Sequence, residues 1–330
     1  MPKHHLRPTA SSLRRAPSSE PCTEPHSTVR RSSLTSPSHR KVLGAEPQIG
    51  ERLGERFELE AILGQGSSGK VYAARDLESG RGYALKLLLG VSPSSIYRLK
   101  REYRALASIH HPNLVSLEGL FHAEPHWFVV MERIDGRTFV DGLSDDPRAT
   151  ERELRARLEQ LALGVGALHA AGLVQRDLKP GNVLVSASGR VVVVDFGLAH
   201  ERRLAVRSRP RASFAGTPAF AAPEQLEGGA PSYAADRYAI GAMLYLALTG
   251  SIPHERGSVA ELAARKRSLP PPPSAVRPGV PPDLESLCLA LLSPAPEQRP
   301  ELTEWLPGRW AACHLALEPA TPAGGAPVDP

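Results

Sequence analysis

Residues 175–182 read Gln-Arg-Asp-Leu-Lys-Pro-Gly-Asn, and Asp195-Phe196-Gly197 follows directly after the apolar run 191–194. We interpret both stretches as short loops around a buried strand. Carboxylate and amide oxygens on such loops can hold Mg²⁺ and orient a hydroxyl nucleophile. The sequence therefore predicts the floor of a phosphoryl-transfer site in this part of the chain.

The composition is typical of a soluble globular protein, with 330 residues of which 41% are apolar and 23% charged. The net charge of +5 originates in residues 1–50, which hold eight Lys and Arg against three Asp and Glu. The remaining residues hold 32 Lys and Arg against 32 Asp and Glu, so their net charge is zero. Because a neutral body has no electrostatic footprint for DNA or RNA, we expect no nucleic-acid partner outside that tail.

Three scattered cysteines, Cys22, Cys288 and Cys313, show no Cys-x-x-Cys spacing, which argues against a disulfide framework and a structural zinc site. The longest uncharged apolar run, 238–248, is shorter than the roughly 20 residues that span a bilayer. The N-terminus also lacks the apolar segment of a secretory signal. We therefore expect a cytoplasmic protein with no membrane partner.

Residues 1–50 are rich in Ser, Pro, Thr and Arg and contain no aromatic residue. Such a segment buries too little apolar surface to offset the entropy of ordering, so we expect a disordered basic tail. An organelle transit peptide and a start codon further downstream are the alternatives that this composition leaves open.

A glycine cluster separates two strand-like stretches, 57–63 and 70–75. The dinucleotide-binding fingerprint opens a helix after its glycines, and the Walker motif requires Ser or Thr after Gly-Lys. Here a strand follows, and Val71 comes after Lys70. Two interpretations remain: an ordinary glycine-rich turn, or a hairpin whose backbone N–H groups close over phosphates while Val71 covers a flat base.

A single cation, Lys86, interrupts the strand-like run 83–88. A lysine that faces inward from a strand is costly unless an acid pairs with it. Apolar residues in 96–106 recur at steps of three and four, which predicts a helix, and Glu102 lies beside them. A solvated Lys and Glu are the alternative. The pair His110-His111 ends this helix, and we assign it a structural role because no third metal ligand follows at useful spacing.

The second half of the chain is predicted to be mainly helical. Apolar residues in 154–168 trace a helical stripe, and two strand-like runs follow between residues 183 and 194. The two loops described first flank this strand pair, which places Asp177, Asn182 and Asp195 within reach of one site. Further helices are expected over 236–248, 258–267, 284–292 and 301–306.

In their order and spacing these motifs resemble the protein kinase family, specifically the eukaryotic-like, Hanks-type serine/threonine kinases of bacteria. The resemblance implies a bilobal α+β fold, with a small β-rich N-lobe that carries one regulatory helix and a larger, mainly helical C-lobe. The expected boundaries are a basic tail at 1–50, the N-lobe at 51–132, the C-lobe at 133–312 and a flexible C-terminal tail at 313–330.

The resemblance also implies catalytic roles for five residues. Lys86 holds the α- and β-phosphates of ATP, and Glu102 clamps Lys86 from the helix. Asp177 is the base that faces the substrate hydroxyl, and Lys179 steadies the γ-phosphate. Thr217 is expected near the base and the acceptor hydroxyl. The implied activity is ATP-dependent phosphorylation of Ser and Thr on protein substrates, with autophosphorylation, in signalling.

The same resemblance supplies a cofactor site. Asn182 and Asp195 are the implied ligands of Mg²⁺, for which Mn²⁺ can substitute. The implied nucleotide-binding residues are Gly64, Gln65, Gly66, Ser67, Ser68, Gly69, Val71, Ala84, Lys86, Met131, Glu132, Ile134 and Leu184.

Two acids have implied structural roles. Glu224 is expected to pair with Arg299, and Asp236 is expected to brace the catalytic loop. One residue departs from the family pattern, because Gln175 stands where these kinases usually have His. Gln can still donate a hydrogen bond but lacks the flat ring that packs against Phe196, so we expect looser packing of the active state.

The segment 200–220 carries several Arg and Ser with little periodicity and is interpreted as a mobile loop. By resemblance, Arg176 receives a phosphate placed on this loop, and Ser208 and Ser213 are the candidate acceptors. In the tail, Ser33 follows two arginines and is a candidate regulatory site, with unmodified disorder as the alternative.

Two other classes of function compete with an active kinase. A pseudokinase would bind nucleotide and signal as a scaffold, and Gln175 is the feature that supports it. A nucleic-acid-binding protein would act through the basic tail, and its binding would depend on salt. The sequence does not identify the protein substrate, the activating signal or the oligomeric state.

Overall fold

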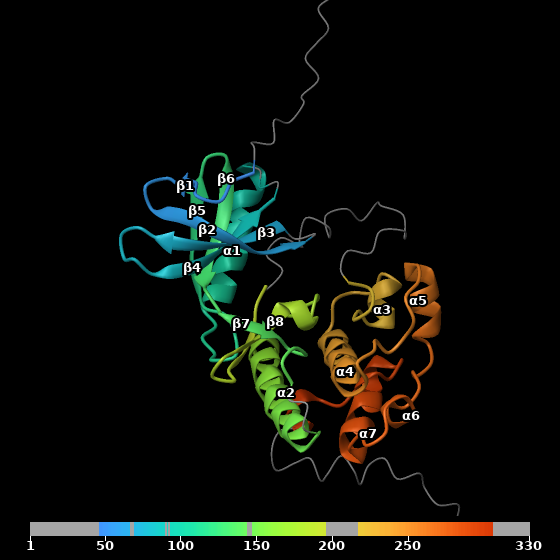
Figure 1. The fold of residues 1–330 in the computed structure, drawn as a ribbon. Coiled ribbons are helices and arrows are strands. Elements are labelled where there is room, and N and C mark those ends of the chain that lie inside the picture. Colours follow the sequence, from blue (N-terminus) through green and yellow to red (C-terminus); the bar gives the residue numbers. More distant parts are fainter. Residues whose placement is uncertain are drawn as a thin grey trace, which may run out of the picture. The chain divides into compact units, whose positions relative to one another are not determined.

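The computed structural model describes residues 46–66, 69–89, 91, 93–143, 147–195 and 217–305, all within one compact unit, Gly44–Pro330. Figure 1 shows two kinds of architecture in it: a large sheet with the helix α1, and a mainly helical part with the helices α2 to α7. The predicted α+β class, with a β-rich N-lobe and a helical C-lobe, is confirmed.

The N-lobe is a six-stranded sheet of order β1-β2-β3-β4-β6-β5 in which all neighbouring strands are antiparallel. Gly66 pairs with Gly69 where β2 turns into β3, so the predicted strand, glycine loop and strand are confirmed. The N-lobe elements are β1 (Arg52–Leu53), β2 (Phe57–Gly66), β3 (Gly69–Asp76), β4 (Gly82–Leu88), α1 (Pro93–Ala107), β5 (Leu117–Ala123) and β6 (His126–Glu132).

Residues 46–50 belong to this lobe. The Tyr72 hydroxyl donates to the Pro47 oxygen at 3.1 Å, and Lys70 pairs with Glu46. The prediction that the disordered tail extends to residue 50 is therefore wrong for these five residues, because two side chains of β3 hold them. The rest of the predicted tail lies outside the described part of the chain.

The C-lobe contains a small sheet of order β7-β8-β9 and six helices among its described residues. Strand β7 was not predicted from the sequence, because three residues are too few to show a periodic pattern. The elements are β7 (Gly136–Thr138), α2 (Pro147–Ala170), β8 (Val183–Ser186), β9 (Val191–Val193), α3 (Pro223–Leu226), α4 (Tyr233–Thr249), α5 (Val259–Arg265), α6 (Pro273–Val276) and α7 (Pro282–Leu291).

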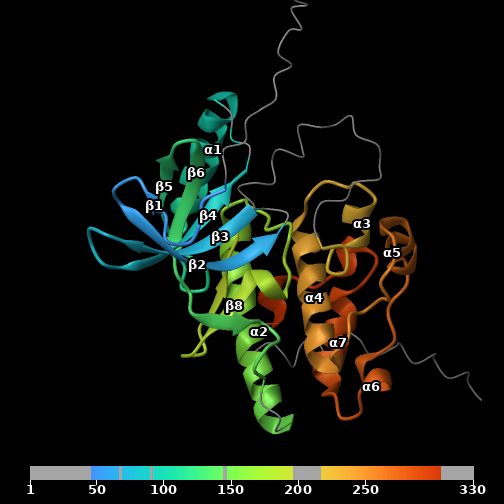
Figure 2. The ribbon, with the colours of Figure 1, turned by 45° about the horizontal axis from the view of Figure 1, so that its top comes forward.

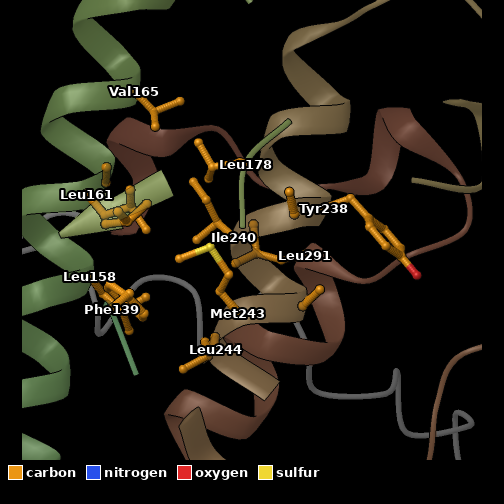
Figure 3. Close-up of a cluster of buried hydrophobic side chains, with 14 of the residues drawn as sticks. Phe139, Leu158, Leu161, Val165, Leu178, Tyr238, Ile240, Met243, Leu244 and Leu291 are labelled. Atoms are coloured by element: carbon orange, nitrogen blue, oxygen red, sulfur yellow. The ribbon is translucent and has the colours of Figure 1, made fainter. Parts of the chain in front are cut away.

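The C-lobe core forms where α2, α4 and α7 meet (Figure 3). A Cβ atom on Gly241 of α4 would lie 2.7 Å from the Leu291 Cβ, so a glycine is needed for α4 and α7 to pack at this distance. Figure 2 shows these two helices beside each other. Core residues labelled in Figure 3 include Leu158, Leu161, Val165, Ile240, Met243 and Leu244.

Helix α4 is defined by its ends as well as by its burial. The Ser232 hydroxyl accepts a hydrogen bond from Ala235 N at 3.1 Å, and Gly250 ends the helix with φ +74°. The helix predicted over 236–248 is thereby confirmed with one more turn. No helix in the described part of the chain combines the length and apolar character needed to cross a bilayer.

Candidate active site

Asp177 lies in a loop that two neighbouring side chains hold in place. Lys179 Nζ donates to Asp177 Oδ2 at 2.7 Å, and Asn182 Nδ2 donates to the Asp177 backbone oxygen at 2.7 Å. Asn182 closes a 3-10 helix, Pro180–Asn182, directly before β8. The other carboxylate oxygen, Oδ1, accepts no hydrogen bond from the described residues. The carboxylate is thus oriented and keeps one oxygen for a proton donor.

A buried acid fixes the start of this loop. Asp236, which is 1% exposed, accepts hydrogen bonds from Gln175 N at 2.8 Å and from Arg176 N at 2.9 Å, and it also bonds to His169 Nε2 at 2.9 Å. Arg176 has φ +71°, a left-handed conformation that is uncommon for a residue other than glycine. Such a conformation persists only where the surroundings enforce it. The structure contains the predicted brace between Asp236 and the catalytic loop.

The Gln175 side chain connects the catalytic loop to the Asp195 segment. It is 2% exposed, and its Nε2 donates to the Asp195 backbone oxygen at 2.7 Å. Asp195 has φ +67°, so this bond helps to hold a second strained residue. Gln175 Oε1 is buried and accepts no hydrogen bond from the described residues. The predicted loose packing against Phe196 stays a prediction, because that residue is not described.

Replacing Gln175 with Leu is expected to lower kcat roughly fivefold, because a lost hydrogen bond of about 1 kcal/mol lets the Asp195 backbone relax. Gln175→His keeps a donor, adds a flat ring and is expected to match or exceed the wild-type rate. Steady-state kinetics on both variants, with thermal unfolding as the control for folding, make the comparison. Equal rates for Leu and His would show that the bond to Asp195 has no role.

Lys86 and Glu102 do not form the predicted ion pair. Lys86 is 3% exposed on β4 and pairs with Asp195 Oδ1, whereas Glu102 on α1 pairs with Arg98 one turn away at 3.1 Å. A buried ammonium requires a counter-charge, and within the described residues Asp195 supplies it. The expected clamp is therefore wrong for this structure, and Lys86 occupies one oxygen of the predicted metal ligand.

Several residues that are predicted to bind the nucleotide lie in or against a separate apolar cluster. Four buried residues form it, and partly buried side chains pack against them. Leu184 on β8 pairs with Val192 of this cluster in the small sheet. The structure thus brings together predicted residues from β3, β4 and β6 in one apolar cluster, and Leu184 lies opposite one of its members on the neighbouring strand. That these residues cover a flat base stays a prediction. The members are Ala84, Val115, Met131 and Val192, with Val71, Leu117, Ile134 and Val194 against them.

Glu132, at the end of β6, is held by an arginine. Its carboxylate accepts two hydrogen bonds from Arg190, at 2.6 and 3.1 Å, and this pairing lowers the pKa of the Glu132 carboxyl. Glu132 N donates to Ser116 O at 2.9 Å. These contacts fix the end of β6, where Glu132 and Ile134 are predicted to bind the nucleotide, and that binding stays a prediction.

The glycines of the phosphate loop divide into two kinds. Gly69 has φ +122°, and a Cβ atom there would lie 2.5 Å from Leu87 O, so no other residue fits without distortion. A Cβ atom on Gly64 or Gly66 would meet nothing within 4 Å. These two positions face open space, which suits a loop that covers phosphates. Residues 67–68 of the predicted site are not described.

Arg299 anchors the segment that ends in Glu224. The Arg299 side chain is fully buried and donates two hydrogen bonds to the Glu224 carboxylate, at 2.6 and 2.9 Å. Its Nε donates to Ser293 O at 2.8 Å, and its guanidinium lies 5.0 Å from the centre of the Tyr238 ring. Burial of the Tyr238 hydroxyl raises the pKa of that group. The structure contains the predicted pair between Glu224 and Arg299.

Arg299→Leu is expected to lower the free energy of unfolding by about 3–5 kcal/mol, because the Glu224 carboxylate loses its partner in a largely buried place. Arg267→Leu is the matched control, since Arg267 pairs with Glu227 on the surface and such pairs contribute below about 1 kcal/mol. Urea unfolding followed by circular dichroism measures both. Equal destabilisation would contradict this account of the buried pair.

Thr217 is the first described residue after a gap at 196–216. Its backbone oxygen accepts a hydrogen bond from Phe220 N at 3.1 Å, but its side chain forms no hydrogen bond with Asp177 or another described residue. Its role beside the base stays a prediction. The candidate phosphorylation sites Ser208, Ser213 and Ser33 lie in parts of the chain that the structure does not describe.

Asn182 and Asp195 have the donor chemistry of a site for a small divalent cation. Val194 N donates to Asn182 O at 2.9 Å, which keeps Asn182 close to the Asp195 segment, and the Asn182 side-chain oxygen accepts no hydrogen bond from the described residues. Mg²⁺ typically takes one or two protein carboxylates and completes its shell with phosphates and waters. Over the described ranges no group of three or more His, Cys, Asp or Glu could hold a metal. The residues present therefore fit a metal that arrives with a nucleotide.

One residue at the site was not singled out from the sequence. Gln225 on α3 accepts a hydrogen bond from Ala222 N at 2.9 Å and donates from Nε2 to Arg176 O at 3.2 Å. It therefore connects the segment before α3 to the catalytic loop. The available signal was its place as third residue of a helix, a common position for capping side chains.

Comparison with known proteins agrees with the fold. Residues 57–311 match the protein kinase domain, so the chain belongs to the protein kinase family. It is 31% identical over 298 residues to serine/threonine-protein kinase PknB of Mycobacterium tuberculosis, covering 88% of this chain and 46% of the relative. It is 36% identical over 283 residues to serine/threonine-protein kinase Pkn1 of Myxococcus xanthus, covering 82% and 40%.

These relatives place the chain in the bacterial branch of the Hanks-type serine/threonine kinases. The chain spans under half the length of each of them.

Proposed function

We propose that this chain transfers the γ-phosphoryl group of ATP to serine and threonine hydroxyls of protein substrates. The observation that carries the proposal is the fixed position of Asp177, whose carboxylate Oδ2 accepts a hydrogen bond from Lys179 and whose backbone oxygen accepts one from Asn182. Membership of the serine/threonine kinases supports the choice of acceptor.

Each residue has a separate proposed role in phosphoryl transfer. Asp177 Oδ1 accepts the hydrogen bond of the substrate hydroxyl and orients its oxygen towards the γ-phosphorus, which is positioning rather than covalent catalysis. Lys179 lies beside Asp177 and offsets charge on the transferred group. Lys86 offsets charge on the other phosphates, and the glycine hairpin excludes water above them.

We propose Mg²⁺ as the metal, with Mn²⁺ able to replace it, held by Asn182 and Asp195. Bound metal would neutralise the phosphate charge that develops during transfer. The hydrogen bond from Gln175 to the Asp195 backbone oxygen holds the backbone from which the Asp195 carboxylate extends. We place the reaction in the cytoplasm, where ATP and Mg²⁺ are available.

Gln175 is the one feature of the sequence that favours the alternative of an inactive pseudokinase. It still donates to Asp195 O at 2.7 Å, which supports an active enzyme over a pseudokinase. We further propose that phosphate on the segment 196–216 pairs with Arg176, whose Nε is buried and has no hydrogen-bond partner within the described residues. Mass mapping of Ser208 and Ser213 after incubation with MgATP tests this.

Three peptides that differ only in one Ser, Thr or Tyr test the proposed acceptor. We expect phosphate transfer to the Ser and Thr peptides with Mg²⁺ and with Mn²⁺, and transfer to Tyr below about one hundredth of the Ser rate. EDTA should stop the reaction. Equal rates on all three peptides would contradict the assignment to serine and threonine.

A further inference from the structure

Lys266 is a buried cation outside the catalytic loop. It follows α5 directly, and the residue is 0% exposed. Its ammonium donates three hydrogen bonds to backbone oxygens of the segment before α3, to Pro218 at 2.9 Å, Ala219 at 2.9 Å and Ala221 at 2.6 Å. Figures 1 and 2 both show α5 beside α3, and their side chains share an apolar cluster.

The number of donors matches the number of acceptors. A lysine ammonium has three N–H donors and no acceptor atom. Here all three donors bond to backbone carbonyls that lie outside helices and strands. A buried carbonyl without a partner costs about 1–3 kcal/mol. Lys266 therefore provides the hydrogen bonds that fix the backbone path of residues 218–221.

The surroundings show that an ammonium in this place is costly. Burial lowers the pKa of Lys266 to about 7, and the Glu224 carboxylate opposes that shift. The ammonium also lies 5.1 Å from the centre of the Tyr238 ring, and the buried Arg299 guanidinium lies 5.0 Å from the same ring. An apolar side chain would avoid this cost, so the lysine needs a role that an apolar residue cannot take.

The segment that Lys266 holds leads to the catalytic base. Residue Ala222, at its end, donates from N to Gln225 Oε1, and Gln225 donates to the backbone oxygen of Arg176, the residue before Asp177. On the other side, Glu224 is fixed by Arg299. Movement of residues 218–221 would therefore shift the surface next to Asp177 without touching the nucleotide site.

We propose that Lys266 is a positioning residue of the acceptor-substrate site. It holds residues 218–221 in the shape on which the backbone around the substrate serine or threonine docks beside Asp177. The inference rests on the proposed kinase activity and adds to it a determinant of protein-substrate binding that is distinct from ATP binding.

Two variants and one control test the role in the full chain. Lys266→Met keeps the length of the stem and removes all three donors, and Lys266→Gln keeps two N–H groups on a shorter side chain. Arg267→Met is the matched control, because the neighbouring Arg267 is exposed and pairs with Glu227 on the surface. Initial rates are measured with a serine peptide and with ATP as the varied substrate.

The expected result is a KM for the peptide that rises roughly tenfold in Lys266→Met and less in Lys266→Gln, while the KM for ATP changes by less than about twofold. Hydrogen exchange should speed up at residues 217–222 in both variants and stay as in wild type at 175–182. Arg267→Met should match wild type in every measurement.

An unchanged peptide KM, or equal rises in the KM for peptide and for ATP, would overturn the proposal. So would loss of the folded state in both variants by circular dichroism, because Lys266 would then support the whole lobe. A wild-type chain that phosphorylates no peptide would instead count against the proposed function. The exchange at residues 217–222 would then still decide whether Lys266 fixes that segment.

Discussion

Asp177→Asn is expected to lower kcat for peptide phosphorylation by about 100- to 10,000-fold while ATP binding is retained. The amide matches the carboxylate in size and keeps an oxygen for the Lys179 ammonium, which lies 2.7 Å from Asp177 Oδ2. The fold of the loop is therefore preserved, and Asn182 still holds the backbone of residue 177. What is lost is the group that accepts the proton of the substrate hydroxyl.

Asp135→Asn is the matched control for this substitution. The Asp135 side chain is 80% exposed and bonds to Arg133 at the surface, so the same chemical change there should leave kcat unaltered. Peptide phosphorylation and ATP binding by calorimetry are measured on both variants. Retention of more than a tenth of the wild-type rate by Asp177→Asn would show that another group is the base.

Asp195→Asn is expected to remove phosphoryl transfer and the dependence of ATP affinity on Mg²⁺. Asp195 is the one carboxylate of the proposed metal site, and an amide oxygen binds Mg²⁺ far more weakly. The substitution also removes the counter-charge of Lys86, which is 3% exposed. Loss of one partner from a buried pair costs about 3–5 kcal/mol, so the free energy of unfolding should fall as well.

Two measurements separate these effects. ATP affinity is determined with Mg²⁺ and with EDTA, and urea unfolding is followed without nucleotide, with Asp135→Asn again as the control. An Asp195→Asn variant in which Mg²⁺ strengthens ATP binding as much as in wild type would rule out Asp195 as a metal ligand. Unchanged stability would show that Lys86 does not depend on this pair for burial.

Several features of the site were predictable because they follow from short motifs at fixed spacing. The loop with Asp177 and Asn182 and the segment with Asp195 flank the β8–β9 pair, as the apolar runs indicate. The pair of Glu224 with Arg299 and the brace by Asp236 were also expected from the family pattern. In each case the residue types and their order along the chain contain the signal.

The partner of Lys86 was not predictable in the same way. From the sequence, Lys86 is predicted to face inward with Glu102 as its partner, and Asp195 is assigned to the metal. Which of these two acids pairs with Lys86 depends on the position of α1 relative to the sheet, and that position arises from packing rather than from any local pattern. In this structure Glu102 pairs within its own helix with Arg98, and Asp195 takes the lysine.

Short elements and single long-range contacts account for the other differences. Strand β7 has three residues and α3 has four, too few for a period of two or of 3.6 to show. The hydrogen bond from Tyr72 to Pro47 O attaches residues 46–50 to the N-lobe, although their composition predicted disorder. In the sequence, Lys266 is one of several charged residues near a helix end. Its burial and its hydrogen bonds to residues 218–221 depend on the packing of distant segments, which no local pattern predicts.

Transfer of labelled γ-phosphate from MgATP to a serine peptide by the purified full chain tests the kinase assignment most directly, with ATP binding measured on the same sample. The account predicts phosphoserine from the wild type and a rate at least about 100-fold lower from Asp177→Asn. Contradiction would come from a wild-type chain that binds ATP but transfers no more phosphate than Asp177→Asn with either Mg²⁺ or Mn²⁺. That result would make the chain a nucleotide-binding scaffold.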